Sequence, residues 1–500
     1  MNIVCLVPPL NLPVNEYGHG YQPPLGLLSI AGALLDAAFQ VELIDADAAH
    51  LSYKEIIDKL NNLNTDVLLV GHSGSIVANP SSLELITAIK NVFPSITILY
   101  GGIYATYAYY EIMSSEQGID YIIAGEGEET TLLLLEALRS NKPDFNKIEG
   151  LVWRSTEGLV TKNASPPPIE NLDQYRVAWE LVNWDLYPGV HKPGRGAIVQ
   201  FSRGCPFTCT YCGQWMFWKR WRHKSIQRFV DELELLCTKY DVHTIWIADE
   251  NIGYDKQTFH SLLRAIRDRK LDLIIFCALT AEDVVRDKND LKLYREAGIV
   301  CLMMGIESFD DAILKRVKKN NHFSVTHRAV LLLQKNNILS IVNVVFGIRN
   351  ETWKSLLEIF QNLRQVSPNY FNALHFTPLS WTPEGRTVNP EHIIQQDQKK
   401  WDFRTPVVHP INFSPKTFAI LIKLIEALFY LRPSWLFSAL FQKDPEVRKI
   451  MFNSSLRLLR VYLDEWKRIF QVSFVKRGAL ALEKKQFGIL MPGNHKSKGK

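Results

Sequence analysis

The chain lacks the long apolar runs that would carry it across a membrane. Its longest candidate, residues 418–431, is interrupted by Lys423 and Glu426, so no membrane span is predicted. The first seven residues carry no basic segment and lead into an apolar strand, so no signal peptide is expected. The formal net charge of +5 over 500 residues is too small to indicate a nucleic acid partner.

The chain has few cysteines, and most of them are far apart in the sequence. Of the seven cysteines, Cys5, Cys237, Cys277 and Cys301 stand singly inside apolar runs. Cysteines in such positions pack as small hydrophobic side chains and form no disulfide framework. The sequence therefore predicts a reducing, cytoplasmic compartment.

The other three cysteines lie close together. Cys205, Cys209 and Cys212 fall within eight residues, directly after the apolar run 197–201. Three thiolates would leave one iron of a 4Fe–4S cube without a protein ligand, and an open iron can bind a small molecule. A closed electron-transfer cluster needs a fourth cysteine and a structural zinc site a second ligand pair, and neither follows in the sequence.

Residues 1–145 alternate strands and helices. Five short apolar runs predict strands near 3–7, 41–44, 67–70, 96–100 and 121–124. Helical patterns follow them near 25–38, 53–63, 80–92, 107–113 and 129–140. Five βα units of this length predict a doubly wound, flavodoxin-like α/β domain, whose ligand lies beyond the carboxyl ends of the strands.

Small residues gather at those strand ends. Glycine at such positions permits positive φ and lets a large ligand approach the backbone. The candidate ligand-binding residues are Ser73, Ser75, Gly101, Gly102, Gly125, Glu126 and Gly127.

A connector and a second βα series follow. Residues 148–163 alternate around a turn and 164–169 are proline-rich, which predicts a hairpin and a stiff linker within 146–192. Over 193–390, strands are predicted near 197–201, 244–248, 273–278, 300–304, 341–346 and 373–376, and helices near 226–240, 256–267, 290–297, 325–336 and 353–366. Six βα units are too few for a closed eight-fold barrel, so a partial (β/α)6 barrel is expected.

The C-terminal region, 391–500, differs from the preceding region because helices, and not alternating strands and helices, are predicted in it. Amphipathic helices are predicted over 414–430 and 445–470, followed by a basic tail at 495–500. The helices could cap the open barrel, or they could lean on a membrane surface.

The spacing CxxxCxxC, with Tyr211 before the last cysteine, resembles the signature of radical S-adenosylmethionine (SAM) enzymes. The resemblance implies a 4Fe–4S cluster on the three cysteines, SAM on the open iron, and an external electron donor of the flavodoxin or ferredoxin type. One electron then releases a 5′-deoxyadenosyl radical. It also implies that the SAM-binding residues are Tyr211, Asp249, Glu250, Glu307, Val345 and Gly347, with Asp249 and Glu250 near the amino group, Glu307 near the ribose, and Val345 and Gly347 beside the adenine.

The first domain resembles the cobalamin-binding domain that is often fused to these enzymes. The resemblance rests on Pro23-Pro-Leu-Gly-Leu, Gly101-Gly102 and Gly125-Glu-Gly-Glu-Glu-Thr. The Asp-x-His-x-x-Gly motif of many cobalamin proteins does not occur, so cobalt is expected to lack a histidine ligand. His19 and His72 are candidate substitutes but are expected to be ordinary loop residues.

Residues 213–222 combine four aromatic residues with three cations, a pattern that suits a planar, anionic or esterified ligand. This segment resembles the anaerobic magnesium-protoporphyrin monomethyl ester oxidative cyclase group. The resemblance implies a tetrapyrrole substrate contacted by Trp215, Trp218 and Arg220. Two alternatives stay open: a cobalamin-dependent radical SAM methyltransferase and a non-catalytic corrinoid- or cluster-binding sensor.

Overall fold

The computed structural model describes residues 1–10, 12, 15, 20–72, 76–140, 143–348, 350–433, 435 and 440–475. The chain divides into two compact units, with the boundary between Tyr187 and Pro188. Ser73, Ser75, His19 and the basic tail at 495–500 lie outside the described residues.

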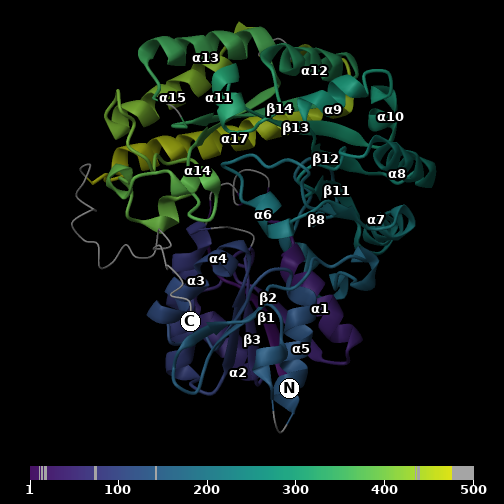
Figure 1. The fold of residues 1–500 in the computed structure, drawn as a ribbon. Coiled ribbons are helices and arrows are strands. Elements are labelled where there is room, and N and C mark those ends of the chain that lie inside the picture. Colours follow the sequence, from purple (N-terminus) through teal and green to yellow (C-terminus); the bar gives the residue numbers. More distant parts are fainter. Residues whose placement is uncertain are drawn as a thin grey trace. The chain divides into compact units, whose positions relative to one another are not determined.

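The first unit is built on a seven-stranded sheet in the order β2-β1-β3-β4-β5-β6-β7 (Figure 1). Strands β1 to β5 are parallel, and their order is that of flavodoxin-like folds, as predicted. The strands are β1 (Asn2–Val7), β2 (Gln40–Asp45), β3 (Val67–Val70), β4 (Thr97–Gly101), β5 (Tyr121–Ile123), β6 (Leu151–Arg154) and β7 (Val160–Lys162). The predicted hairpin is thus the antiparallel edge β6–β7 of this sheet.

Helices cover both faces of this sheet. They are α1 (Leu25–Asp36), α2 (Tyr53–Asn62), α3 (Asn79–Val92), α4 (Ile103–Ser115) and α5 (Gly127–Arg139). Helices α1 and α5 pack together on one face, and α2, α3 and α4 flank the other (Figure 1). Because β3 lies in the middle of the sheet, every one of its residues is buried, which explains its unbroken apolar sequence.

The second unit contains a six-stranded parallel sheet in the order β15-β14-β13-β12-β11-β8. The strands are β8 (Arg195–Val199), β11 (Val242–Ile247), β12 (Ile274–Ala278), β13 (Ile299–Glu307), β14 (Leu339–Phe346) and β15 (Tyr370–His375). Intervening helices are α7 (Ile226–Tyr240), α8 (Lys256–Arg269), α9 (Ala281–Arg286), α10 (Leu291–Glu296), α11 (Asp311–Arg316), α12 (Phe323–Lys335) and α13 (Trp353–Val366). Since the sheet order follows the chain order, this is the predicted partial (β/α)6 barrel.

The last helix of the described chain covers part of one face of the second sheet. The helix α17 (Pro445–Gln471) packs its residues Val447, Ile450 and Met451 against one face of this sheet. The strand residues that it covers include Phe276, Cys301, Leu339, Ile341 and Tyr370, which lie in register on that face. Further along the same face, toward the carboxyl ends of the strands, Asn343, Val345, Asn372 and Leu374 are only half-buried. The face therefore has an apolar half closed by α17 and a more open half next to the strand ends.

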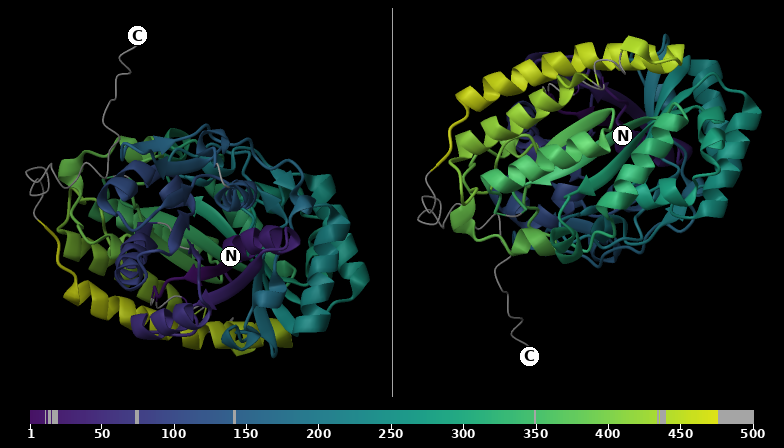
Figure 2. Two further views of the ribbon diagram at one scale, coloured as in Figure 1. Left: turned by 90° about the horizontal axis from the view of Figure 1, so that it is seen from below. Right: turned by 90° about the horizontal axis from the view of Figure 1, so that it is seen from above.

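A second helix, α15 (Pro415–Tyr430), lies alongside α17, the long yellow helix of Figure 2. The buried Lys423 ammonium joins the two helices, because it donates to Glu426 on its own helix and to Glu465 on α17 at 2.6 Å. The Tyr462 hydroxyl also donates to the Lys423 carbonyl at 2.8 Å. Among the described residues, no helix is both long enough and apolar enough to span a membrane.

Candidate active site

The three cysteines lie on a loop that a two-stranded ladder closes. Strand β9 (Ser202–Arg203) pairs antiparallel with β10 (Arg222–His223), so residues 204–221 project from the carboxyl end of β8. Gly204 opens the loop with φ +98°, and a Cβ there would lie 2.1 Å from the Arg220 carbonyl oxygen. Only glycine allows this close approach of the two ends of the loop.

Asp249 anchors the base of the loop. It follows β11, is buried, and accepts hydrogen bonds from the Phe201 and Ser202 amides at 2.9 and 2.7 Å and from the Ser202 hydroxyl at 2.5 Å. Burial raises the pKa of this carboxyl to about 7, against the opposing effect of these hydrogen bonds. Both oxygens are thus used within the protein, which makes Asp249 a support of the loop.

The middle of the loop is held from two other directions. The Thr210 amide donates to the Val317 carbonyl at 3.0 Å, and the Thr210 carbonyl accepts from the Glu384 amide at 2.9 Å. The indole N–H of Trp215 donates to the Cys209 carbonyl at 3.1 Å. These bonds fix the backbone on which Cys205, Cys209 and Cys212 are spaced.

The chemistry of the donor set fits an iron–sulfur cluster. All seven cysteines of the chain lie in the described part and are free thiols. Burial raises the pKa of Cys212 to about 12 and also raises the pKa values of Cys205 and Cys209, while the Lys319 ammonium opposes the rise at both of these. Buried thiols of this kind become thiolates only when a cationic centre compensates their charge, as a cluster does.

Glu307 stands at the carboxyl end of β13 in a strained backbone conformation. Its φ is +59°, which a non-glycine residue rarely adopts, and the register of β13 against β14 shifts between Gly305 and Glu307. A Cβ on Gly305 would lie 2.2 Å from the Glu307 Oε1 atom, so glycine leaves the room that the carboxylate needs. The Lys319 ammonium lies 3.6 Å from the same oxygen. Strain of this kind is typical of ligand-binding positions.

The remaining SAM-binding candidates lie either beside the cysteine loop or near the end of β14. Burial raises the pKa of Glu250 to about 7, and its Oε2 atom has no hydrogen-bond partner in the described part of the chain. Burial and the neighbouring Glu307 raise the pKa of Tyr211, which shows that Tyr211 lies near this carboxylate. Val345 lies near the end of β14, and Gly347 follows that strand with φ +91°. The structure therefore brings Tyr211 and Glu307 together with the cysteine loop, and Glu250 beside Cys205.

The aromatic segment forms a short helix, α6 (Gln214–Trp218). Trp215 supports the Cys209 carbonyl, as described above, and the Arg203 guanidinium lies 5.3 Å from the centre of the Trp218 ring. Arg220 is exposed, and its carbonyl accepts from the Arg222 Nε atom at 3.3 Å. The three predicted substrate residues thus belong to the cysteine loop, and each has contacts within it or with the ladder that closes it.

The strand ends of the first unit fit a large ligand. Gly102 and Gly125 have φ of +108° and +97°. A Cβ on Gly102 would meet no described atom within 4 Å, so this strand end is open. Glu126 immediately precedes α5, and a Cβ on Gly127 would lie 2.8 Å from the Ile30 side chain. His72 shares a hydrogen bond with the buried Tyr100 hydroxyl at 3.1 Å, which engages one of its ring nitrogens.

The sequence analysis missed several residues of the candidate site. Lys319 lies in a run of lysine and asparagine that is typical of an exposed turn, yet it contacts Glu307. Asn372 donates to Asn343 at 2.9 Å across β14 and β15, on the half-open face of the sheet. The polar residue within each apolar strand was the available signal for this pair.

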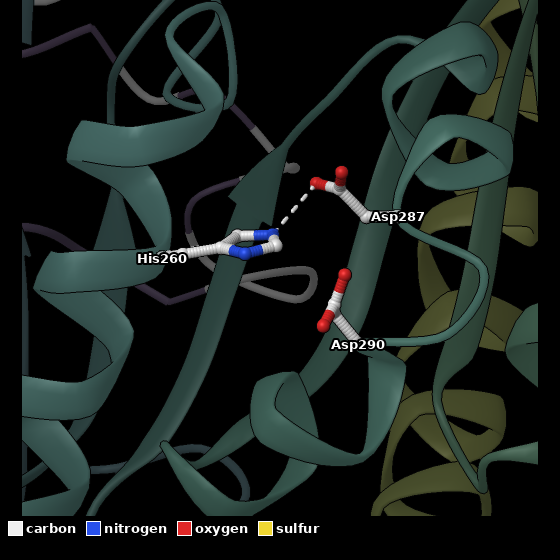
Figure 3. A group of neighbouring side chains, drawn as sticks. All are labelled: His260, Asp287 and Asp290. Carbon is white, nitrogen blue, oxygen red and sulfur yellow. Dashed lines mark ion pairs between the residues drawn. The ribbon is translucent and has the colours of Figure 1, made fainter.

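A further cluster, His260, Asp287 and Asp290, has the residue types of a metal site (Figure 3). Asp287 already faces cations, because Arg286 donates to it at 2.7 Å and Lys256 lies 3.5 Å away. Burial tends to raise the pKa of Asp287, but hydrogen bonds from Arg286 and Tyr294 outweigh it and lower the pKa to about 2. We interpret this cluster as an internal ion-pair network that joins α8 to α9 and α10.

Two family models match the chain. The radical SAM superfamily model covers residues 199–363, and the B12 binding domain model covers residues 14–135. In a search of solved structures, the radical SAM methyltransferase TsrM from Kitasatospora setae, with tryptophan substrate and a SAM analogue bound, matches with a TM-score of 0.69 at 18% identity. The match covers 94% of this chain and 99% of that one.

Two curated relatives are similar over most of their length. The anaerobic magnesium-protoporphyrin IX monomethyl ester cyclase of a Synechocystis strain is 35% identical over 94% of both chains. The enzyme of the same name from Rubrivivax gelatinosus is 28% identical over 86% of this chain and 78% of its own.

Fold, domain models and site chemistry define a class: this is a radical SAM enzyme with a 4Fe–4S cluster, SAM and a cobalamin-binding domain. Within that class, the chain belongs to the family of the anaerobic magnesium-protoporphyrin IX monomethyl ester cyclases. The predictions of superfamily, cofactors and fold class are thereby confirmed.

Proposed function

We propose that this chain is an anaerobic oxidative cyclase that acts on magnesium-protoporphyrin IX monomethyl ester or a closely related tetrapyrrole. The observation that carries the proposal is the 35% identity to the Synechocystis cyclase over 94% of both chains. The 470 aligned residues exceed the spans of the two domain models, so the similarity is not confined to the shared domains.

The cofactor sites are assigned to particular residues in this proposal. Cys205, Cys209 and Cys212 hold the cluster, and an external flavodoxin or ferredoxin reduces it. When bound, the cluster and SAM supply a 5′-deoxyadenosyl radical that removes a hydrogen atom from the propionate ester arm. In the first unit, Gly101, Gly102, Gly125, Glu126 and Gly127 line the cobalamin site. Ser73 and Ser75 stay predictions there.

Around the cluster, the three carboxylates have different proposed roles. Asp249 is saturated by Phe201 and Ser202, so it keeps the loop in place. Glu250, with an oxygen that has no partner among the described residues, is the better acceptor for the SAM amino group. In this proposal Glu307 accepts from the ribose hydroxyls, Val345 and Gly347 flank the adenine, and Tyr211 is a further SAM-binding residue.

The half-open face of the second sheet provides a wall for the substrate. Leu374 offers apolar surface, and the neighbouring Asn343–Asn372 pair offers amide groups. Trp215, Trp218 and Arg220 contribute stacking area and positive charge from the cysteine loop. A flat macrocycle with carboxylate and ester arms suits this combination.

The test is one anaerobic incubation of reconstituted protein with SAM, cobalamin, a reductant and magnesium-protoporphyrin IX monomethyl ester. We expect mass spectrometry to show the product with the additional ring, together with 5′-deoxyadenosine. The control variant, with all three loop cysteines replaced by alanine, should form neither. An unchanged porphyrin, with deoxyadenosine released without coupling, contradicts the cyclase assignment.

The same experiment separates the alternatives. A gain of one methylene in mass indicates a methyltransferase, the activity in the name of the structurally similar TsrM. The absence of both porphyrin turnover and deoxyadenosine indicates a sensor. Spectra of the Co(II) form test the cobalamin site separately, and nitrogen splitting from a histidine would contradict the prediction that cobalt lacks that ligand.

A further inference from the structure

The long helix α17 has two apolar faces, and one of them is exposed. Its first face, with Val447, Ile450 and Met451, is buried against the sheet of the second unit. The other face carries five large apolar side chains that are each 53 to 63% exposed. They are Phe452, Leu456, Leu459, Leu463 and Phe470, which we call the apolar stripe.

The geometry of an α-helix places the members of the stripe in one line. Successive residues are turned by about 100°, so all five side chains fall within about 60° of one another around the helix axis. Together they expose roughly 500 Å² of apolar surface, which lies toward the upper end of what monomeric proteins leave in contact with water. A patch of this size indicates an interaction surface.

Positive charge borders the stripe. The exposed side chains of Lys449, Arg460 and Lys467 lie about 60–80° from Phe452 on one side, and Arg448 lies about 40° away on the other. Within α17, all of whose residues are described, no acidic side chain falls in this sector. Asp464 lies further around the helix and pairs with Arg468 at 2.6 Å.

We propose that the apolar stripe of α17 and its four flanking cations form a docking surface for an anionic membrane. An exposed apolar line with a basic border is the pattern by which a helix lies in the interface between lipid headgroups and acyl chains. The cations then meet lipid phosphates, and the leucine and phenylalanine side chains enter the acyl boundary. The helix binds along the surface, consistent with the absence of a membrane-spanning helix among the described residues.

The positive charge beside the apolar stripe favours an anionic membrane over a second copy of the chain as the binding partner. A two-fold pairing would use the same patch on both copies. It would gather eight cations around one interface, and the patch contributes no carboxylate to neutralise them. An anionic lipid surface supplies the missing negative charge. This inference stands on the exposed face of α17 and does not depend on the cyclase proposal.

The test measures binding of the full chain to vesicles by cosedimentation. We expect binding to vesicles of phosphatidylglycerol and phosphatidylcholine in equal parts, weaker binding at high salt, and little binding to phosphatidylcholine alone. The variant Phe452→Ser/Leu456→Ser/Leu463→Ser should fall to background. The variant Lys449→Gln/Arg460→Gln/Lys467→Gln should bind about a hundredfold more weakly, because each surface cation contributes about fivefold.

A matched control variant tests whether vesicle binding depends on the apolar stripe in particular. Leu235, Leu331 and Leu357 are exposed leucines on α7, α12 and α13, at 41, 52 and 56% exposure. Their replacement by serine removes similar apolar area elsewhere in the second unit and should leave vesicle binding unchanged. Circular dichroism checks the fold of each variant, and the charge variant tests the proposal even if the serine variant misfolds.

Three results would overturn the proposal. The first is vesicle binding by the natural sequence that neither α17 variant reduces, and the second is no vesicle binding at all. The third is a dimer in solution that the stripe variant dissociates without any vesicle binding, which would assign the surface to a second copy. Porphyrin turnover is measured separately, so a failed cyclase assay leaves this result unaffected.

Discussion

Gly204 offers a direct test of how the cysteine loop is closed. In Gly204→Ala, the new Cβ would lie 2.1 Å from the Arg220 carbonyl oxygen, and a backbone oxygen cannot rotate away. The positive φ costs about 1–2 kcal/mol for any residue with a side chain, and the overlap adds about 1–3 kcal/mol. We therefore expect destabilisation of about 2–5 kcal/mol and, because Cys205 is the next residue, loss of most of the cluster.

Gly158 provides the matched control. It also has positive φ, +78°, but a Cβ there meets no described atom within 4 Å. Gly158→Ala should therefore cost only about 1–2 kcal/mol and leave the iron content unchanged. Iron per chain after reconstitution and the urea midpoint of the apoprotein measure the two effects. Equal iron content in both variants would refute the argument that close packing at Gly204 forms the loop.

Three further perturbations test other parts of the second unit. Glu307→Gly and Glu307→Gln both remove the carboxylate that faces Lys319, so both should bind SAM at least tenfold more weakly by calorimetry. The glycine variant should be more stable than the glutamine variant by about 1 kcal/mol, because it relieves the positive φ. Equal stability of the two variants would contradict the inferred backbone strain. Burial and the nearby Lys423 lower the pKa of His375 to about 3, so the folded chain keeps this ring neutral and loses stability as the pH falls from about 6.5 toward 3. His375→Phe should remove about 2 kcal/mol of the loss between pH 7 and 5, seen in urea midpoints at both values, and an unchanged pH dependence would count against the assignment. Asn372→Leu should raise the KM for the porphyrin about tenfold, as one lost polar contact would, while deoxyadenosine formation without substrate stays unchanged; an unaltered KM would remove this residue from the substrate wall.

Periodicity predicted most helices and strands to within a few residues. The helices α7 and α13 have the expected bounds, and β3 does as well. These elements have strong apolar patterns and clear ends: Ser225 and Thr352 cap the two helices, and β3 is a fully buried run. The short helices α9 and α11 were not expected, because six residues are too few to show a helical period.

Candidate site residues could be named where spacing or resemblance carries the information, and their roles stay predictions. The three cysteines and Glu307 could be named from spacing and resemblance. The roles of Asp249 and Lys319 could not, because they depend on contacts between distant segments. Asp249 lies 47 residues from Ser202 in the sequence, and its anchoring function follows only from their hydrogen bonds. In the same way, the sequence predicted an amphipathic helix over 445–470 but not which of its two apolar faces would be buried.

The packing of α17 sets the order in which this protein can mature. Phe276, Cys301 and Ile341 share a core cluster with Val447, Ile450 and Met451, so this face of the second sheet stays incompletely covered until residues 447–451 have been synthesised. The cysteine loop precedes that point by more than two hundred residues. Cluster insertion during synthesis would therefore meet an unfinished barrel. Delivery of iron and sulfur after chain release is the order that this architecture favours.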